Sequence, residues 1–207
     1  NVITASTKYG VPISIAISTD KACSSLSVYG DTKYLMEKCF LEANSEKNKF
    51  AVCRFANVAQ SNGSVLPFWM KLKREGKPLK LTNPKMSRLM FSKEDAAELI
   101  YKTVNICEKE GGGFVCSIKM KKVAMIDLAK NISDEIQIVG ERVGEKYIED
   151  LISEKELPFT YVFDDYIIIK NEKNVGSNTL KKPYNSTIAE KMSQNEIRTL
   201  IYGESDN

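Results

Sequence analysis

The chain has 207 residues, of which 43% are hydrophobic and 28% charged, an ordinary balance for a globular protein with a packed core. The formal net charge of +3 is too small to indicate a nucleic-acid partner. The short basic cluster Lys119, Lys121 and Lys122 has no interleaved aromatic residues and favours a solvated face. The chain contains no histidine, so any acid–base chemistry must use Tyr, Lys, Asp, Glu or Cys, and a metal site is not expected.

The cysteines favour a reducing compartment. They are odd in number, form no C-x-x-C pair and lie mostly in apolar runs; they are Cys23, Cys39, Cys53, Cys107 and Cys116. We expect them to be free thiols that serve packing. No apolar run approaches the roughly 20 residues that span a bilayer, and the first residues do not form a signal peptide. The sequence therefore predicts a cytoplasmic protein without a membrane segment.

The first 60 residues predict alternating helices and strands. Asn1–Ser6 is typical of the end of a helix, which Gly10 closes, and Val11–Ile17 is typical of a buried parallel strand. Helical spacing of apolar residues follows over Tyr29–Asn44, and Phe50–Phe55 is a second buried strand. This order is that of a doubly wound α/β sheet.

The later elements are short and separated by glycine and proline. We expect strands over Leu79–Thr82, Phe114–Ile118, Ile136–Val139 and Tyr161–Lys170, and helices over Ser92–Cys107, Val123–Ile132, Lys146–Leu151 and Ser193–Tyr202. The last helix has Ser193 as its N-cap and Glu196 at the third helical position. Residues 171–184 are polar and predict a loose segment. Trp69 is expected in the core.

Polar residues follow both early strands directly. Ser18–Lys21 comes after the first strand and Asn57–Val58 after the second. In open α/β sheets, ligands bind beyond the carboxyl ends of the strands, so both segments are candidate site residues. Asn57 could equally form a turn.

Tyr29 and Lys33 are the first candidates for chemistry. Four residues apart on a helix, they share one face. An ammonium beside a phenol favours the phenolate, which can take a proton from a sugar hydroxyl. The same spacing also occurs by chance in many helices.

The upstream Thr19, Asp20 and Lys21 strengthen this interpretation. An adjacent acid and amine can act at the two ends of one β-elimination: the amine removes a proton next to a ketone and the acid protonates the departing hydroxyl. In isolation, Asp20-Lys21 could be a surface turn.

Taken together, these segments resemble the active-site region of extended short-chain dehydrogenases/reductases, in the branch of UDP-N-acetylglucosamine 4,6-dehydratases and CapD-like polysaccharide-biosynthesis proteins. The resemblance covers nearly the whole chain. The segments that carry it are Ser18–Ala22, Tyr29–Lys33, Arg54–Val58, Ser61–Pro67, Pro84–Arg88, Gly140–Lys146 and Tyr184–Ser186.

The resemblance implies catalytic roles. Tyr29, assisted by Thr19, would be the base for oxidation at C4 of the sugar, and Lys33 would hold Tyr29 and the nicotinamide ribose. Asp20 would expel the C6 hydroxyl and Lys21 would be the base at C5.

It also implies binding roles. The cofactor, NAD or NADP, would contact Tyr29, Lys33, Phe55, Asn57 and Val58. The nucleotide sugar would contact Asn57, Ser64, Val65, Arg88, Arg142 and Glu145. Asn57 and the Ser64-Val65 backbone would meet the diphosphate region, both arginines would pair with the phosphates, and Glu145 would accept hydrogen bonds from the ribose. Without the resemblance, Arg88 could cap a sheet edge and Arg142 with Glu145 could form a local ion pair.

For the domains, the resemblance implies an α/β fold: the C-terminal part of a Rossmann-like parallel sheet over 1–60, and a smaller α/β substrate region over 61–170. A segment near 86–107 would return to the Rossmann part, and 171–207 would be a polar tail with the last helix. The G-x-G-x-x-G turn of the family has no counterpart, so we expect the first half of the dinucleotide domain to precede Asn1.

The implied partners are a UDP-sugar substrate and, at full length, further copies of the chain. A nucleotide-sugar 4-epimerase of the same fold and a non-catalytic nucleotide-sugar-binding fragment are the alternatives. The same residues serve C5 retention or inversion, so the sequence does not choose between them.

Overall fold

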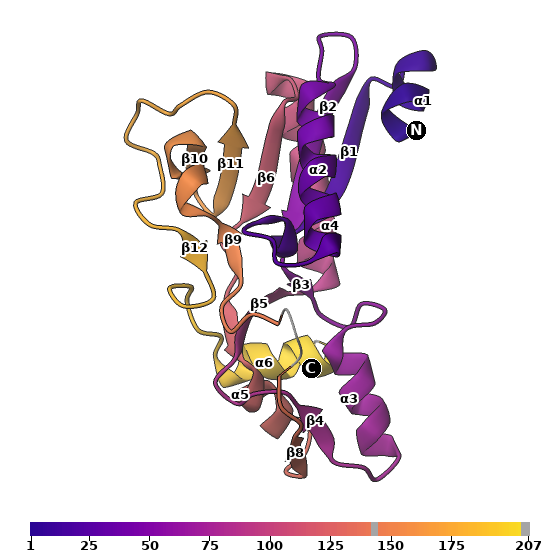
Figure 1. Cartoon of the computed structure of the whole chain (residues 1–207), viewed down its shortest axis with the longest axis vertical. Coiled ribbons are helices and arrows are strands. Elements are labelled where there is room, and N and C mark those ends of the chain that lie inside the picture. Colours follow the sequence, from indigo (N-terminus) through magenta and orange to yellow (C-terminus); the bar gives the residue numbers. More distant parts are fainter. Residues whose placement is uncertain (142–144, 204–207) are drawn as a thin grey trace. The chain divides into compact units, whose positions relative to one another are not determined.

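The computed structural model describes residues 1–141 and 145–203. The chain forms two compact, interleaved units, which are treated separately below (Figure 1). The first unit comprises Asn1–Phe55, Ala96–Lys119 and Asp150–Tyr184. The second comprises Ala56–Asp95, Met120–Glu149 and Asn185–Asn207, of which the last four residues lie outside the described part.

The first unit is built on a mixed five-stranded sheet with the order β1-β2-β6-β11-β10. Its parallel part consists of β1 (Ile13–Thr19), β2 (Lys49–Phe55) and β6 (Phe114–Ile118). An antiparallel hairpin of β10 (Thr160–Phe163) and β11 (Tyr166–Lys170) continues the sheet from β6. The predicted Rossmann-like α/β class is confirmed, and the expected β-run over Tyr161–Lys170 is a hairpin rather than one strand.

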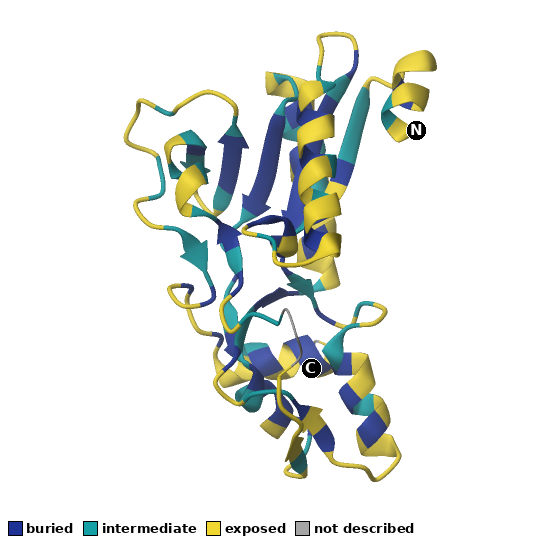
Figure 2. Cartoon of the chain, in the orientation of Figure 1, coloured by how far each residue is buried: buried dark blue, intermediate teal, exposed yellow. Residues whose placement is uncertain are grey.

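Helices cover both faces of this sheet. The first residue of β2, Lys49, is partly exposed. The residues after it, through Phe55, are buried, as the dark blue of Figure 2 shows. Successive side chains of a strand point to opposite faces. Cys53 contacts Thr103 of α4 (Lys93–Glu110), whereas Arg54 contacts Glu37 of α2 (Val28–Glu42), so these two helices lie on opposite faces of β2. This is the layering expected of a doubly wound sheet.

Shorter elements complete the first unit. They are α1 (Val2–Lys8), the 3₁₀ turns η1 (Asp20–Ala22) and η2 (Glu154–Phe159), and strand β9 (Asp150–Ile152). β12 (Tyr184–Asn185) lies where the chain passes from the first unit to the second.

The helix expected over Lys146–Leu151 is wrong. No helix forms there, and the chain enters strand β9 at Asp150. The neighbouring residues Leu151 and Ile152 are both fully buried, and the carbonyl of Leu151 accepts a hydrogen bond from Arg54. Tertiary contacts decide this segment.

In its described residues, the second unit has small sheets and helices around an apolar core. β5 (Ser87–Phe91) pairs in parallel with β3 (Asn57–Val58) and antiparallel with β7 (Lys122–Ala124), and β4 (Leu79–Leu81) pairs in parallel with β8 (Ile136–Ile138). The helices are α3 (Val65–Arg74), α5 (Met125–Lys130) and α6 (Gln194–Tyr202).

Trp69 is central to this core, as predicted: it is 1% exposed and its Nε1 donates to the carbonyl of Lys80 at 2.9 Å. Ser193 and Glu196 form the predicted capping box of α6. The helix expected over Val123–Ile132 is partly wrong, because its first residues belong to β7.

The two units alternate along the chain. Besides 1–55, the first unit includes residues 96–119 and 150–184. The predicted boundaries stay a prediction about independently folding domains. Among the described residues, no helix has the length and apolar character needed to cross a bilayer.

Candidate functional site

In the first unit, the predicted acid and base lie at the carboxyl end of β1. Asp20 has a fully buried side chain, and its Oδ1 accepts hydrogen bonds from the Thr19 hydroxyl at 2.8 Å and from the Lys21 ammonium at 3.2 Å. Thr19 also caps η1, since its Oγ1 accepts from the backbone N–H of Lys21. The Lys21 side chain is 43% exposed. Asp20-Lys21 is therefore a half-buried contact pair rather than an exposed surface turn.

Helix α2 presents the second predicted pair. Ser27 caps this helix by accepting from the backbone N–H of Gly30, so Tyr29 and Lys33 fall in its first turns, on one face. Tyr29 is 54% exposed. The Lys33 ammonium donates to the carbonyl of Ile17 in β1 at 2.9 Å, which ties this helix face to the strand that ends in Thr19.

Gly30 lets α2 approach the turn that carries Lys21. A Cβ added at Gly30 would lie 2.3 Å from the carbonyl oxygen of Lys21 and 2.2 Å from Ser25 Oγ. Any side chain here would push the helix away, so the glycine is required by a close approach rather than by its φ angle. Phe55 ends β2, where it pairs in register with Thr19 and is 9% exposed. The first unit thus places helix α2, which carries Tyr29 and Lys33, against the turn η1 that carries Lys21 and against the strand that ends in Thr19.

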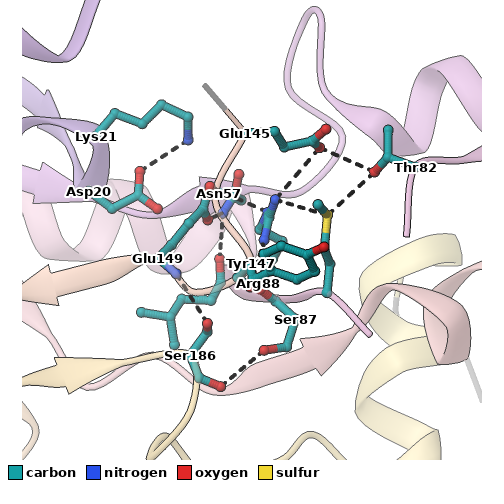
Figure 3. A network of polar contacts seen from close by, with 12 residues as sticks. Asp20, Lys21, Asn57, Thr82, Ser87, Arg88, Glu145, Tyr147, Glu149 and Ser186 are labelled. Atoms are coloured by element: carbon teal, nitrogen blue, oxygen red, sulfur yellow. Dashed lines mark hydrogen bonds and ion pairs between the residues drawn. The ribbon is translucent and has the colours of Figure 1, made fainter. Parts of the chain in front are cut away.

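In the second unit, Arg88 is enclosed by acidic residues (Figure 3). Its side chain is 11% exposed; Nε lies 3.3 Å from Glu149 Oε1 and Nη2 lies 3.7 Å from Glu145 Oε1. Nη1 donates to the carbonyls of Ser87 at 3.0 Å and Tyr147 at 3.3 Å. The guanidinium is held rigidly rather than left as a solvent-exposed cap of the sheet edge.

Asn57 contacts the same acidic cluster from β3. Its Nδ2 donates to Glu149 Oε2 at 2.7 Å and to the carbonyl of Leu89 at 3.0 Å. Val58 pairs with Phe91 of β5 in register. Asn57 is thus part of a network and not a simple turn former.

Ser64 and Val65 begin helix α3. Ser64 occupies the N-cap position without a side-chain cap, and its Oγ is buried with no hydrogen-bond partner among the described residues. Val65 packs on the apolar core of the unit. The first backbone N–H groups of such a helix have no partner within it, and they favour an anion.

Comparison with known proteins identifies the chain. The family described as "Polysaccharide biosynthesis protein" matches residues 1–171. The chain belongs to this polysaccharide-biosynthesis family. It is 38% identical, over 176 residues, to a UDP-N-acetylglucosamine 4,6-dehydratase (inverting) of Campylobacter jejuni, covering 82% of this chain and 52% of that protein. It is 29% identical to a UDP-glucose 4-epimerase of Rickettsia rickettsii, covering 97% and 64%.

A solved structure agrees with these relatives. Pen from Bacillus thuringiensis superposes with a TM-score of 0.85 at 27% identity, over 97% of this chain and 64% of that chain. The resemblance to extended short-chain dehydrogenases/reductases is confirmed. The chain spans about half the length of the Campylobacter relative (52%), so what the whole protein does is a matter for proposal.

Two further residues of the predicted region are Arg142 and Glu149. Arg142 lies outside the described residues. Glu149, by contrast, was missed: sequence reasoning singled out Arg88, Asn57 and Glu145 but not the carboxylate that joins the first two. Its only sequence signal is its place, four residues after Glu145, within a charged segment. Among the described residues, no group of His, Cys, Asp or Glu is arranged to hold a metal ion.

Proposed function

We propose that this polysaccharide-biosynthesis family member acts as a nucleotide-sugar 4,6-dehydratase on UDP-N-acetylglucosamine, with NAD or NADP as cofactor. The observation that carries the proposal is the buried Asp20 carboxyl in contact with both Thr19 and Lys21. The identity to a Campylobacter jejuni dehydratase supports the substrate. Cytoplasmic location and assembly with further copies stay predictions.

The Asp20–Lys21 pair fits an elimination because it takes up one proton from the substrate and gives one back, so that its own protonation is the same before and after the step. Transfer of one proton across the 3.2 Å contact would convert the ion pair into a carboxylic acid and a neutral amine. The amine would then take the C5 proton, and the acid would protonate the C6 hydroxyl as it leaves as water. The products are again an ammonium and a carboxylate, so the pair returns to its starting form.

Tyr29 and Lys33 fit the cofactor half of the reaction. The half-exposed Tyr29, acting as the phenolate, would take the C4 hydroxyl proton and become a phenol. Lys33 uses one N–H on the carbonyl of Ile17 and retains two N–H groups, which can bind the ribose hydroxyls. The chemistry that a bound nicotinamide supplies is uptake of hydride from C4 and its return to C6. In the second unit, Arg88 would meet the phosphates and Glu145 the ribose, as the family resemblance implies. The contact of 3.7 Å between Glu145 Oε1 and Arg88 Nη2 places these two side chains next to each other.

The test is product analysis with the protein expressed at the full length of its gene, supplied with NAD or NADP and UDP-N-acetylglucosamine. A 4-keto-6-deoxy product is expected. Asp20→Asn should lower kcat by about 100-fold or more, the range of a lost general acid. The matched control is Asp31→Asn, an exposed carboxylate on α2, which should leave kcat unchanged.

A 4-epimerase is the second candidate, favoured by the Rickettsia rickettsii relative. It would produce only the C4 epimer, and Asp20→Asn would hardly alter its rate because no hydroxyl is expelled. That pair of results would refute the dehydratase assignment.

A further inference from the structure

The amide of Asn57 has only one orientation compatible with its neighbours. Its nitrogen lies 2.7 Å from Glu149 Oε2 and 3.0 Å from the carbonyl oxygen of Leu89. A backbone carbonyl only accepts hydrogen bonds, and so does the carboxylate of Glu149 in its ion pair with Arg88. Turning the amide over would place its oxygen against two acceptors, so the usual ambiguity of an Asn side chain is resolved here by chemistry.

This orientation decides what Asn57 can offer a ligand. Both N–H groups of the amide are used within the unit, and among the described residues no hydrogen bond reaches Oδ1. The remaining atom is an acceptor. A diphosphate has no proton to give near neutral pH, whereas a sugar has hydroxyl groups and an acetamido N–H.

We infer that Asn57 acts as a hydrogen-bond acceptor for a hydroxyl or acetamido N–H of the sugar, and not as a donor to the diphosphate, and that Glu149 is the positioning residue that sets this polarity. The inference rests on the proposed function and deepens it. It departs from the expectation that Asn57 meets the diphosphate region, and it makes Asn57 a determinant of sugar recognition.

Glu149 has the contacts that this role requires. Its residue is 8% exposed, Oε2 holds Asn57, Oε1 holds Arg88, and its backbone N–H and carbonyl pair with Ser186. The carboxylate of Glu149 therefore holds two groups next to each other: the Arg88 guanidinium, which can bind phosphate, and the Asn57 amide, whose oxygen can accept a hydrogen bond from the sugar. Its charge also keeps the amide protons of Asn57 turned inward.

The experiment compares two ligands that differ by the sugar. Affinities of the full-length protein for UDP and for UDP-N-acetylglucosamine are measured by titration calorimetry. Asn57→Ala should weaken UDP-N-acetylglucosamine about fivefold, the value of one hydrogen bond, and leave UDP within about twofold. An equal loss for both ligands would overturn the inference while leaving the proposed function intact.

A polarity exchange provides the second variant. Asn57→Asp alone sets two carboxylates against each other and should weaken binding of UDP-N-acetylglucosamine. Asn57→Asp combined with Glu149→Gln restores the hydrogen bond between positions 57 and 149 and again presents an acceptor, but the Leu89 carbonyl loses its donor. The double variant should therefore bind UDP-N-acetylglucosamine more tightly than Asn57→Asp does and more weakly than the wild type. If the double variant binds UDP-N-acetylglucosamine no more tightly than Asn57→Asp does, Glu149 does not set the polarity at position 57 and the inference is wrong. Failure of the wild type to bind either ligand would instead refute the proposed function itself.

Discussion

Replacing Arg54 with methionine removes a guanidinium that is 1% exposed and contacts two carboxylates. Nε and Nη2 hold Glu37 at 3.0 and 2.6 Å, Nη2 also holds Glu156 at 2.8 Å, and Nη1 donates to the carbonyl of Leu151 at 2.9 Å. The residue thus joins β2 to α2, β9 and η2. Burial alone would lower the pKa of Arg54, but Glu37 and Glu156 outweigh it and raise the pKa.

The loss at neutral pH should be large. Breaking a buried ion pair by removing one partner typically costs about 3–5 kcal/mol, because the other charges stay buried without compensation. Glu156 gives an independent estimate: burial raises its pKa, but Arg54 and Ser153 more than offset this and lower it from 4.5 to about 2. A shift of that size corresponds to about 3 kcal/mol of stabilisation.

The sign of the pH dependence follows from the direction of this shift. A carboxyl whose pKa is lowered by folding contributes stability above its unfolded pKa of 4.5, and loses it as the pH falls towards 2. In Arg54→Met the burial of Glu156 remains without the cation, so protonation becomes favourable in the folded state. The free-energy difference between wild type and variant should therefore begin to shrink above pH 4.5, where the buried Glu156 of the variant takes up a proton, and should continue to shrink as the pH falls towards 2.

Urea unfolding followed by circular dichroism at pH 7, 5 and 3 measures these differences. The exposed pair Lys77–Glu75 is the control, since Lys77→Met should produce no measurable change. If Arg54→Met does not fold, Glu156→Gln keeps the bonds of Arg54 to Glu37 and should show a smaller loss with the same pH trend. A loss below about 1 kcal/mol at pH 7, or one that does not vary with pH, would refute the reasoning.

Three further predictions concern other parts of the two units. Gly30→Ala should destabilise the protein by about 1–3 kcal/mol in urea and lower turnover, because its Cβ would lie 2.3 Å from the Lys21 carbonyl; an unchanged midpoint would contradict the close approach. Gln60 adopts a φ of 55°, and its Nε2 donates to the carbonyls of Leu200 and Ile201 at the end of α6. Gln60→Ala should therefore lower the free energy of unfolding by about 1–2 kcal/mol, and Gln60→Gly should lower it less because glycine adopts this φ without strain. Equal losses in the two variants would show that the backbone strain is irrelevant. Of the thiols, exposed Cys39 should react with a disulfide reagent at pH 8 within seconds, whereas Cys53, whose pKa burial raises to about 12, should react only on unfolding.

Much of the fold could be predicted from the sequence because the relevant signals are local. Strands β2 and β6 are largely apolar runs that are buried as predicted, and β6 is predicted residue for residue over Phe114–Ile118. Strand β1 was also expected to be buried, and this is wrong for most of it: as an edge strand of this sheet it is mostly partly exposed, and Ile17 is 38% exposed. The start of helix α6 is predicted by the capping box of Ser193 and Glu196, which lie three residues apart. The candidate catalytic residues could likewise be predicted, because Thr19, Asp20, Lys21, Tyr29 and Lys33 lie within one short stretch of the chain.

Segments with short or mixed patterns depended on tertiary contacts. Helix α3 was not predicted, because the glycine and proline residues around it obscure its pattern, and β9 was mistaken for a helix. Leu151 and Ile152 are buried together, which no single periodicity of an isolated strand or helix would indicate.

The sequence by itself determined the family, the α/β class and the residue types available for acid–base chemistry. Only the tertiary structure decided the polarity of the site: that Asp20 is held between Thr19 and Lys21, and which atom of Asn57 remains for a ligand. Glu149 is 92 residues from Asn57 along the chain. Propensity and periodicity act over a few residues, whereas the direction of a hydrogen bond depends on which distant group folding places beside it.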